Sequence, residues 1–189
     1  MKDKGHYKRE SKVDVKHYVE NLEKQYHSLQ REVATIIELV ANSLDAKASR
    51  IEINLNKEEG TLEVVDDGFG MSKKEFIEYH NLSSTTKVRG EDIGFAGQGA
   101  KLALGFCKKI VTETWSAGAF QGSSKWYLKG NRAPYDFCPG VLLELGHLGT
   151  KVTLYLKPKA TSFYNEKNIE QVLVEHYFPL LDSRLRDNY

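Results

Sequence analysis

The chain has 189 residues, of which 40% are hydrophobic and 28% are charged, and its formal net charge is +1. These values are typical of one compact globular domain and exclude a disordered tail or a strongly basic nucleic-acid-binding chain, so nucleic acid is not an evident partner. No stretch approaches the ~20 apolar residues that a membrane helix needs, and the first residues show no secretory signal. We therefore expect a cytoplasmic protein that does not contact a membrane.

The first part of the chain predicts two helices. Residues 1–12 carry no pattern and are expected to form a flexible arm before a domain spanning 13–180. Apolar residues recur at helical steps over 13–29 and again over about 29–48. On the second helix one apolar face is formed by Leu29, Val33, Ile36, Ile37, Val40 and Leu44. Glu38, Asn42 and Asp45 recur at steps of four and three on the other side, where a solvated polar face is the ordinary interpretation.

A hairpin follows these helices. Apolar and polar residues alternate over 51–56 and 61–66, with a glycine-containing turn between the two strands. Ser72, with Glu75 three residues later, predicts a capping box for a short helix that ends near residue 80. Residues 81–98 form the least regular part of the chain, and a helix is expected over 99–108.

The last part of the chain predicts strands at 109–116, 124–130, 141–146 and 149–157. A final helix is expected over 166–177, ending before Pro179, and residues 181–189 are expected to fray. Cys107 and Cys138 fit no metal-ligand spacing and are expected to be reduced thiols, the first in a helix and the second in a loop. This order of elements predicts an α/β (α+β) two-layer sandwich, in which a mixed, mostly antiparallel sheet carries helices on one face.

Two glycine clusters stand out as candidate phosphate or nucleotide sites. Asp66-Asp-Gly-Phe-Gly-Met71 follows the second strand, and Gly94-Phe-Ala-Gly-Gln-Gly-Ala-Lys-Leu102 precedes a helix. The second cluster fails the P-loop pattern, because Lys101 falls one residue late and Leu102 replaces the Ser or Thr. Tight turns would explain either cluster singly. However, a glycine-rich segment that opens directly into a helix is also a suitable anion site.

Four stretches, taken in order, resemble the GHKL family (gyrase B, the heat-shock chaperone of ninety kilodaltons, histidine kinases and MutL), whose ATP site is the Bergerat fold. Residues 38–46 are similar to its N box, 66–70 to its G1 box, 93–101 to its G2 box and 149–150 to its last nucleotide-contacting motif. Each stretch alone would be weak support, but all four in this order cover about residues 29–157. The resemblance implies ATP and Mg²⁺ as cofactors.

The resemblance implies a role for each residue of the N box and its partners. Glu38 would be the general base that orients or deprotonates the attacking water. Asn42 would coordinate Mg²⁺, and Asp45 would brace the site. Asp66 would accept a hydrogen bond from the adenine amino group, supported by Thr150.

The glycine boxes would supply the remaining nucleotide contacts. Gly68 and Gly70 would let the backbone pass under the base, and Met71 would pack on it, whereas Asp67 is interpreted as solvated or structural. Backbone N–H groups for the phosphates would come from Gly97, Gln98, Gly99 and Ala100. Lys101, and with less support Lys87, would reach a phosphate.

The motifs are most similar to the branch of the family that contains MutL, MORC proteins, the heat-shock chaperone and the B subunit of type VI topoisomerases. A histidine kinase is disfavoured because neither His17 nor His27 has a suitable context. The branch implies an ATPase in which closure of residues 81–98 and homodimerisation drive a conformational step. It also implies a transducer-type domain or partner chain, without which hydrolysis would be slow. A regulatory ATP-binding module without useful hydrolysis, or a kinase-like relative, is the alternative.

Overall fold

The computed structural model describes residues 14–26, 30–82, 98–139 and 146–181. The expected arm at 1–12 lies outside these residues, as do residues 182–189 of the expected tail. The helices are α1 (Val15–Gln25), α2 (Arg31–Asp45), α3 (Lys73–Tyr79), α4 (Gly99–Ala103), α5 (Pro158–Phe163) and α6 (Glu166–Leu181). The strands are β1 (Ile51–Asn56), β2 (Thr61–Asp66), β3 (Cys107–Trp115), β4 (Gln121–Trp126), β5 (Tyr135–Pro139) and β6 (Gly149–Leu156).

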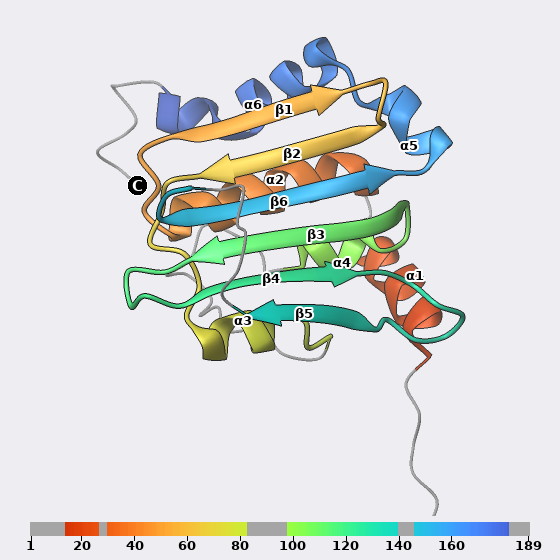
Figure 1. The fold of residues 1–189 in the computed structure, drawn as a ribbon. Coiled ribbons are helices and arrows are strands. Elements are labelled where there is room, and N and C mark those ends of the chain that lie inside the picture. The colour runs from red at the N-terminus through yellow and green to blue at the C-terminus, as the bar shows by residue number, and fades with distance from the viewer. Residues whose placement is uncertain (1–13, 27–29, 83–97, 140–145, 182–189) are drawn as a thin grey trace, which may run out of the picture.

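The strands form one sheet in the order β1-β2-β6-β3-β4-β5, and each neighbouring pair among them is antiparallel. The chain therefore returns at its end to insert β6 between the hairpin β1–β2 and strand β3. Figure 1 shows α2 and α4 behind the sheet, and no described helix covers the face toward the viewer. The predicted two-layer α/β sandwich with helices on one face is confirmed. No described helix is both long and apolar enough to cross a membrane.

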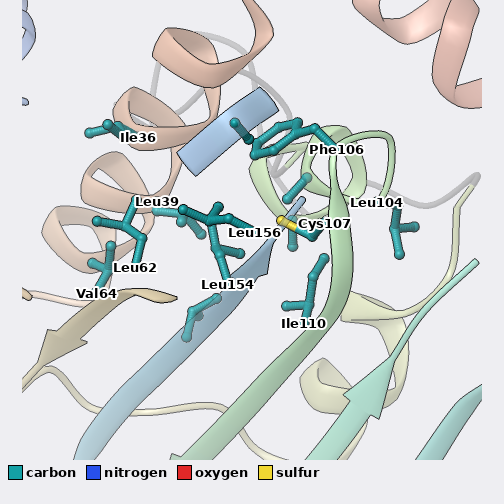
Figure 2. Packing of buried hydrophobic residues seen from close by; sticks show 14 of the residues in the cluster. Ile36, Leu39, Leu62, Val64, Leu104, Phe106, Cys107, Ile110, Leu154 and Leu156 are labelled. Atoms are coloured by element: carbon teal, nitrogen blue, oxygen red, sulfur yellow. The ribbon is translucent and has the colours of Figure 1, made fainter. Parts of the chain in front are cut away.

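The core lies between the sheet and α2. Leu62, Leu154 and Ile110 are each 0% exposed, and they occupy matching positions on three adjacent strands. They belong to one buried cluster with Ile36 and Leu39 of α2, several members of which are shown in Figure 2. Since side chains alternate along a strand, the residues between them point to the helix-free face.

Helix α2 is more deeply buried than its periodicity predicted. Every residue from Ala34 to Ala41 is buried, including Glu38 at 2% exposure. The ordinary interpretation of this side as a solvated polar face, which the resemblance already disfavoured, therefore does not hold over this part of the helix. The reason is α4, which packs on the side of α2 that the sheet leaves open: a Cβ added to Gly99 would lie 2.7 Å from Cβ of Glu38.

Several element boundaries differ from the sequence predictions. Helix α4 ends at Ala103, so Cys107 lies in β3 and not in a helix, and Cys138 lies in β5 and not in a loop. Both cysteines are free thiols. Strand β4 begins and ends earlier than expected.

Strand β5 occupies a stretch whose prolines favoured a loop. Among the described strands it is an edge strand paired with β4 alone, and a proline is tolerated there because no second described ladder is interrupted. The strand expected at 141–146 falls mainly on residues outside the described part of the chain, and Gly146 is not in a strand.

The end of the chain also differs. Helix α5 was not predicted, and α6 continues through Pro179 to Leu181 instead of ending before the proline. A proline in the last turn removes only one hydrogen bond, which limits its effect there.

Candidate functional site

Asp66, the last residue of β2, lies at the centre of the candidate site. Its side chain is 6% exposed and accepts three hydrogen bonds. The donors are the Ser43 hydroxyl at 2.9 Å, the Gly68 N–H at 3.0 Å and the Thr150 N–H at 3.2 Å. Burial raises the pKa of this carboxyl, while the three hydrogen bonds oppose that rise. The structure thus holds a desolvated acceptor in one orientation at the end of the strand.

Strand β6 supplies the neighbouring part of the site. Thr150 lies directly opposite Asp66 in the β2–β6 ladder. The Thr114 hydroxyl donates to the Gly149 carbonyl at 3.2 Å and accepts from the Met71 N–H at 2.7 Å. Gly149 has φ +133°, and a Cβ there would lie 1.9 Å from the carbonyl oxygen of Asp66. Only glycine fits at this position, where the backbone of β6 closely approaches the backbone at the end of β2.

The loop after β2 is fixed by backbone contacts. Asp67 accepts hydrogen bonds from the N–H groups of Ser49 and Arg50 at 2.7 and 2.9 Å, and from the Ser49 hydroxyl at 2.6 Å. These bonds, led by the one from the Ser49 hydroxyl, lower the pKa of Asp67. Asp67 therefore joins the loop to the start of β1, as a structural residue would.

The two glycines of this loop have packing reasons of their own. A Cβ on Gly68 would lie 2.7 Å from the Ala46 carbonyl oxygen at the end of α2. Gly70 has φ +65°, and a Cβ there would lie 2.3 Å from the Trp115 carbonyl oxygen. Met71, next in the chain, is half-buried. These close approaches hold the loop against α2 on one side and β3 on the other.

Helix α2 brings the N-box residues to the same region. Ser43 reaches Asp66, Asn42 and Asp45 are half-buried, and Glu38 lies one turn before Asn42, against Gly99 of α4. Glu38 accepts a hydrogen bond from the Tyr26 hydroxyl at 3.3 Å. Helix α2 therefore places the buried Glu38 carboxylate near α4 and the Ser43 hydroxyl on Asp66. The resemblance implies that Asp66 selects adenine.

The G2 box is described only from Gln98 onward; Gly97 and Lys87 lie outside the described residues. Gln98 is half-buried, and among the described residues its side-chain oxygen has no hydrogen-bond partner. Ala100 and Lys101 are 2% and 3% exposed on α4, and burial lowers the pKa of the Lys101 ammonium. Lys101 is thus an inward-facing residue and not a surface lysine.

Sequence reasoning missed Ser43 and Thr114. Ser43 stands inside the N box, and its position one residue after Asn42 turns it toward the strand. Thr114 carries no motif at all, and only the register of β3 with β6 places it opposite Thr150. Within the described ranges no three His, Cys, Asp or Glu side chains converge to hold a metal ion by themselves.

A shallow hollow of about 340 Å³ lies beside Asp66 and is lined by Arg50, Glu52, Val65, Asp66, Asp67, His147 and Leu148. Val65 and Glu52 are a cross-strand pair whose side chains point away from α2. The hollow therefore opens on the helix-free side, away from Ser43 and Glu38, and we do not assign it to the nucleotide.

The arrangement can be compared with known proteins. The family model described as "Histidine kinase-, DNA gyrase B-, and HSP90-like ATPase" matches residues 29–130. The chain belongs to this ATPase family. The match begins at α2 and runs past Asp66 and α4, so it includes the N box and both glycine boxes.

Relatives of this chain come from two branches of the family. It is 33% identical over 131 residues to the DNA mismatch repair protein MutL of Pelotomaculum thermopropionicum, covering 64% of the chain and 20% of that protein. It is 37% identical over 78 residues to MutL of Dictyoglomus turgidum, covering 37% of the chain and 14% of the relative. It is 26% identical over 155 residues to the chaperone protein HtpG of Buchnera aphidicola, covering 74% of the chain and 24% of the relative.

The predicted position near the MutL and heat-shock-chaperone branches is confirmed. The chain spans only between 14% and 24% of the lengths of these three relatives.

Proposed function

We propose that this ATPase-family chain binds ATP with Mg²⁺ and hydrolyses it slowly, with Glu38 as general base, Asn42 as a Mg²⁺ ligand and Asp66 as the adenine acceptor. The observation that carries the proposal is the placement made by α2. The same rigid helix puts Glu38 against the start of α4 and Ser43 on Asp66. The base and the adenine contact are thus held in a fixed relation, which positional catalysis requires.

The donor set of the described residues fits both ligands. An ionised carboxylate offers about four lone-pair sites. Three donors already reach Asp66, which leaves one acceptor position for an exocyclic amino group. The Asn42 amide supplies the neutral oxygen that suits Mg²⁺ when phosphates provide the negative charge.

Bound Mg²⁺·ATP supplies an electrophilic phosphate whose charge is partly neutralised. The chain's own contribution is at Glu38, whose carboxylate is excluded from bulk water and oriented by the Tyr26 hydroxyl. A carboxylate in such a place can hold a water in line and accept its proton. Gln98 and Ala100 stand at the same end of α4 and are proposed to offer N–H groups to the phosphates, with Gly97, Lys101 and Lys87 as further phosphate contacts.

Three finer features belong to the proposal. Closure of residues 81–98 over the nucleotide, an ATP-dependent homodimer, and a transducer-type domain or partner chain are inferred from the resemblance. Residues 83–97 lie outside the described part of the chain, so the support for closure is the family relationship alone. The proposed transducer-type domain or partner chain likewise rests on the family relationship.

The test compares wild type with Glu38→Gln and Glu38→Ala. Glutamine is the sharper variant, because it keeps the volume that packs against Gly99. We expect both variants to bind ATP·Mg²⁺ with unchanged Kd and to lose phosphate release measured in single-turnover assays. Glu32→Gln, on the same helix and paired with Arg31, is the matched control and should retain turnover.

Each outcome has a clear meaning. Equal, near-zero phosphate release in wild type and Glu38→Gln, with ATP bound by both, would identify a regulatory binding module. Failure of wild type to bind ATP would refute the site. Brisk turnover by the isolated chain, abolished in Glu38→Gln, would contradict slow hydrolysis and show that no partner is needed. ATP-dependent dimerisation is measured on the same samples by light scattering.

A further inference from the structure

The first turn of helix α1 is attached to the turn between strands β4 and β5. Asp14 caps the helix by accepting from the His17 N–H at 3.1 Å, and it also accepts from the Asn131 side-chain amide at 2.9 Å. The Val15 N–H donates to the Asn131 carbonyl at 3.2 Å. These contacts fix the start of α1 to the turn between β4 and β5, which lies 117 residues further along the chain.

The body of α1 is seated on α2 and α4. Leu22 of α1, Ala34 of α2 and Leu102 of α4 form a small buried cluster, each at most 2% exposed. Gly105 lies close beneath α1, since a Cβ there would lie 2.5 Å from the Glu23 carboxylate oxygen and 3.1 Å from Cγ1 of Val19. The Tyr18 hydroxyl donates to the Leu82 carbonyl at 2.5 Å. Helix α1 is therefore held in a fixed position by contacts along its whole length.

Tyr26, at the end of α1, reaches Glu38, the proposed base. Tyr26, the C-cap of α1, is half-buried and packs against the Leu22–Ala34–Leu102 cluster. Its hydroxyl donates to Oε1 of Glu38. Burial, and then the charge of Glu38 and the hydrogen bond to it, raise the pKa of Tyr26, so the hydroxyl remains a donor at every working pH.

We propose that Tyr26 is a positioning residue for Glu38: its hydroxyl, held in place by α1, fixes the rotation of the Glu38 carboxylate in the geometry needed to activate water. This inference rests on the proposed function of Glu38. A glutamate side chain has three rotatable bonds, and a 1 Å misplacement of a catalytic group can slow a reaction by about a hundred-fold. A hydrogen bond from a packed helix removes that freedom at one oxygen while leaving nucleotide contacts untouched.

The test uses two Tyr→Phe variants, one on α1 and one on α6, that each remove a hydroxyl donating a hydrogen bond to α2. Tyr26→Phe removes the donor to Glu38. Tyr177→Phe removes a hydroxyl that donates to the Ile37 carbonyl at 2.6 Å. Ile37 is the residue before Glu38 in α2. Single-turnover phosphate release at saturating ATP and the Kd for ADP are measured for both variants and for wild type, with thermal unfolding to verify that each is folded.

We expect Tyr26→Phe to reduce the rate at saturating ATP about ten-fold, as loss of a hydrogen bond to a charged group would, and to leave the ADP Kd within two-fold. Tyr177→Phe should leave both within about two-fold. An unchanged rate in Tyr26→Phe overturns the proposal. An equal loss in Tyr177→Phe, or a rate loss matched by weaker ADP binding, also overturns it by showing a general effect on α2.

Failure of the proposed function is distinguishable from failure of this inference. If wild type does not bind ATP, or if Glu38→Gln releases phosphate at the wild-type rate, Glu38 is not the base and Tyr26 positions nothing catalytic. If Glu38→Gln abolishes turnover and Tyr26→Phe does not change it, the base stands and only the role of Tyr26 is refuted.

Discussion

Replacement of Asp66 by asparagine separates the recognition role of this residue from its structural role. Asparagine has nearly the same shape, and its carbonyl oxygen can still accept from the Gly68 and Thr150 N–H groups, which both reach Oδ1 of Asp66. The amide nitrogen then stands where Oδ2 accepted from Ser43, and the Ser43 hydroxyl can reverse to accept from it. The fold should therefore tolerate the change.

The expected change in stability at pH 7 is small. Because burial raises the pKa of Asp66, the folded protein binds a proton at this site more readily than the unfolded chain. Ionised Asp66 accordingly lowers the stability at neutral pH, and this loss disappears as the pH falls below the unfolded pKa. Asparagine removes the desolvated charge but weakens three charge-assisted hydrogen bonds. The two effects oppose each other, and we expect the free energy of unfolding to change by less than about 1 kcal/mol.

The expected change in nucleotide affinity is large. A hydrogen bond to a charged acceptor contributes about 1.5–3 kcal/mol, so its loss should weaken ADP binding about 10- to 100-fold. Isothermal titration with ADP and urea unfolding measure the two quantities on the same preparation. Asp67→Asn is the matched control, since Asp67 is adjacent, exposed and bonded to Ser49 and Arg50. Full ADP affinity in Asp66→Asn, or an equal loss in Asp67→Asn, would refute the assignment of Asp66 to adenine.

Two further predictions concern stability. Gly70→Ala should cost about 3 kcal/mol or more in the free energy of unfolding, because its Cβ would lie 2.3 Å from the Trp115 carbonyl oxygen. Gly130→Ala, with φ +59° and open space, should cost only about 1 kcal/mol in urea unfolding, and equal costs would contradict the steric argument. Burial lowers the pKa of His80 to about 4, so the unfolded chain binds a proton there that the folded protein does not. Stability should fall by about 2 kcal/mol as the pH drops from about 6.5 toward 4; His80→Gln should lose that dependence and exposed His147→Gln should retain it.

The local features of the fold were predictable because neighbouring residues create them. The spacing of Glu38, Asn42 and Asp45 places them on one helix, and α2 contains all three. The capping box of Ser72 and Glu75 forms with both of its hydrogen bonds. The β1–β2 hairpin has the boundaries that the alternation of residues indicated.

Predictions failed where a local signal had to compete with packing. The prolines around β5 favoured a loop, but an edge position makes a strand acceptable there. The apolar run after Gly99 favoured a longer helix, but the chain turns at Gly105 under α1 and enters β3 at Cys107. For α4 the neighbour, α1, is distant in the sequence, whereas for β5 it is the preceding strand β4 and the decisive factor is the edge position.

The sequence by itself determined the family and the fold class, because motif order and helical spacing are properties of consecutive residues. Only the tertiary structure decided how the residues of the motifs are placed. The tertiary structure buries Glu38 beneath α4. It also places the Thr150 N–H on Asp66, although the two residues are 84 positions apart in the sequence. In the same way it brings the Tyr26 hydroxyl to the Glu38 carboxylate. Burial and long-range hydrogen bonds depend on strand register and on which helix covers which face, and no pattern of neighbouring residues encodes them.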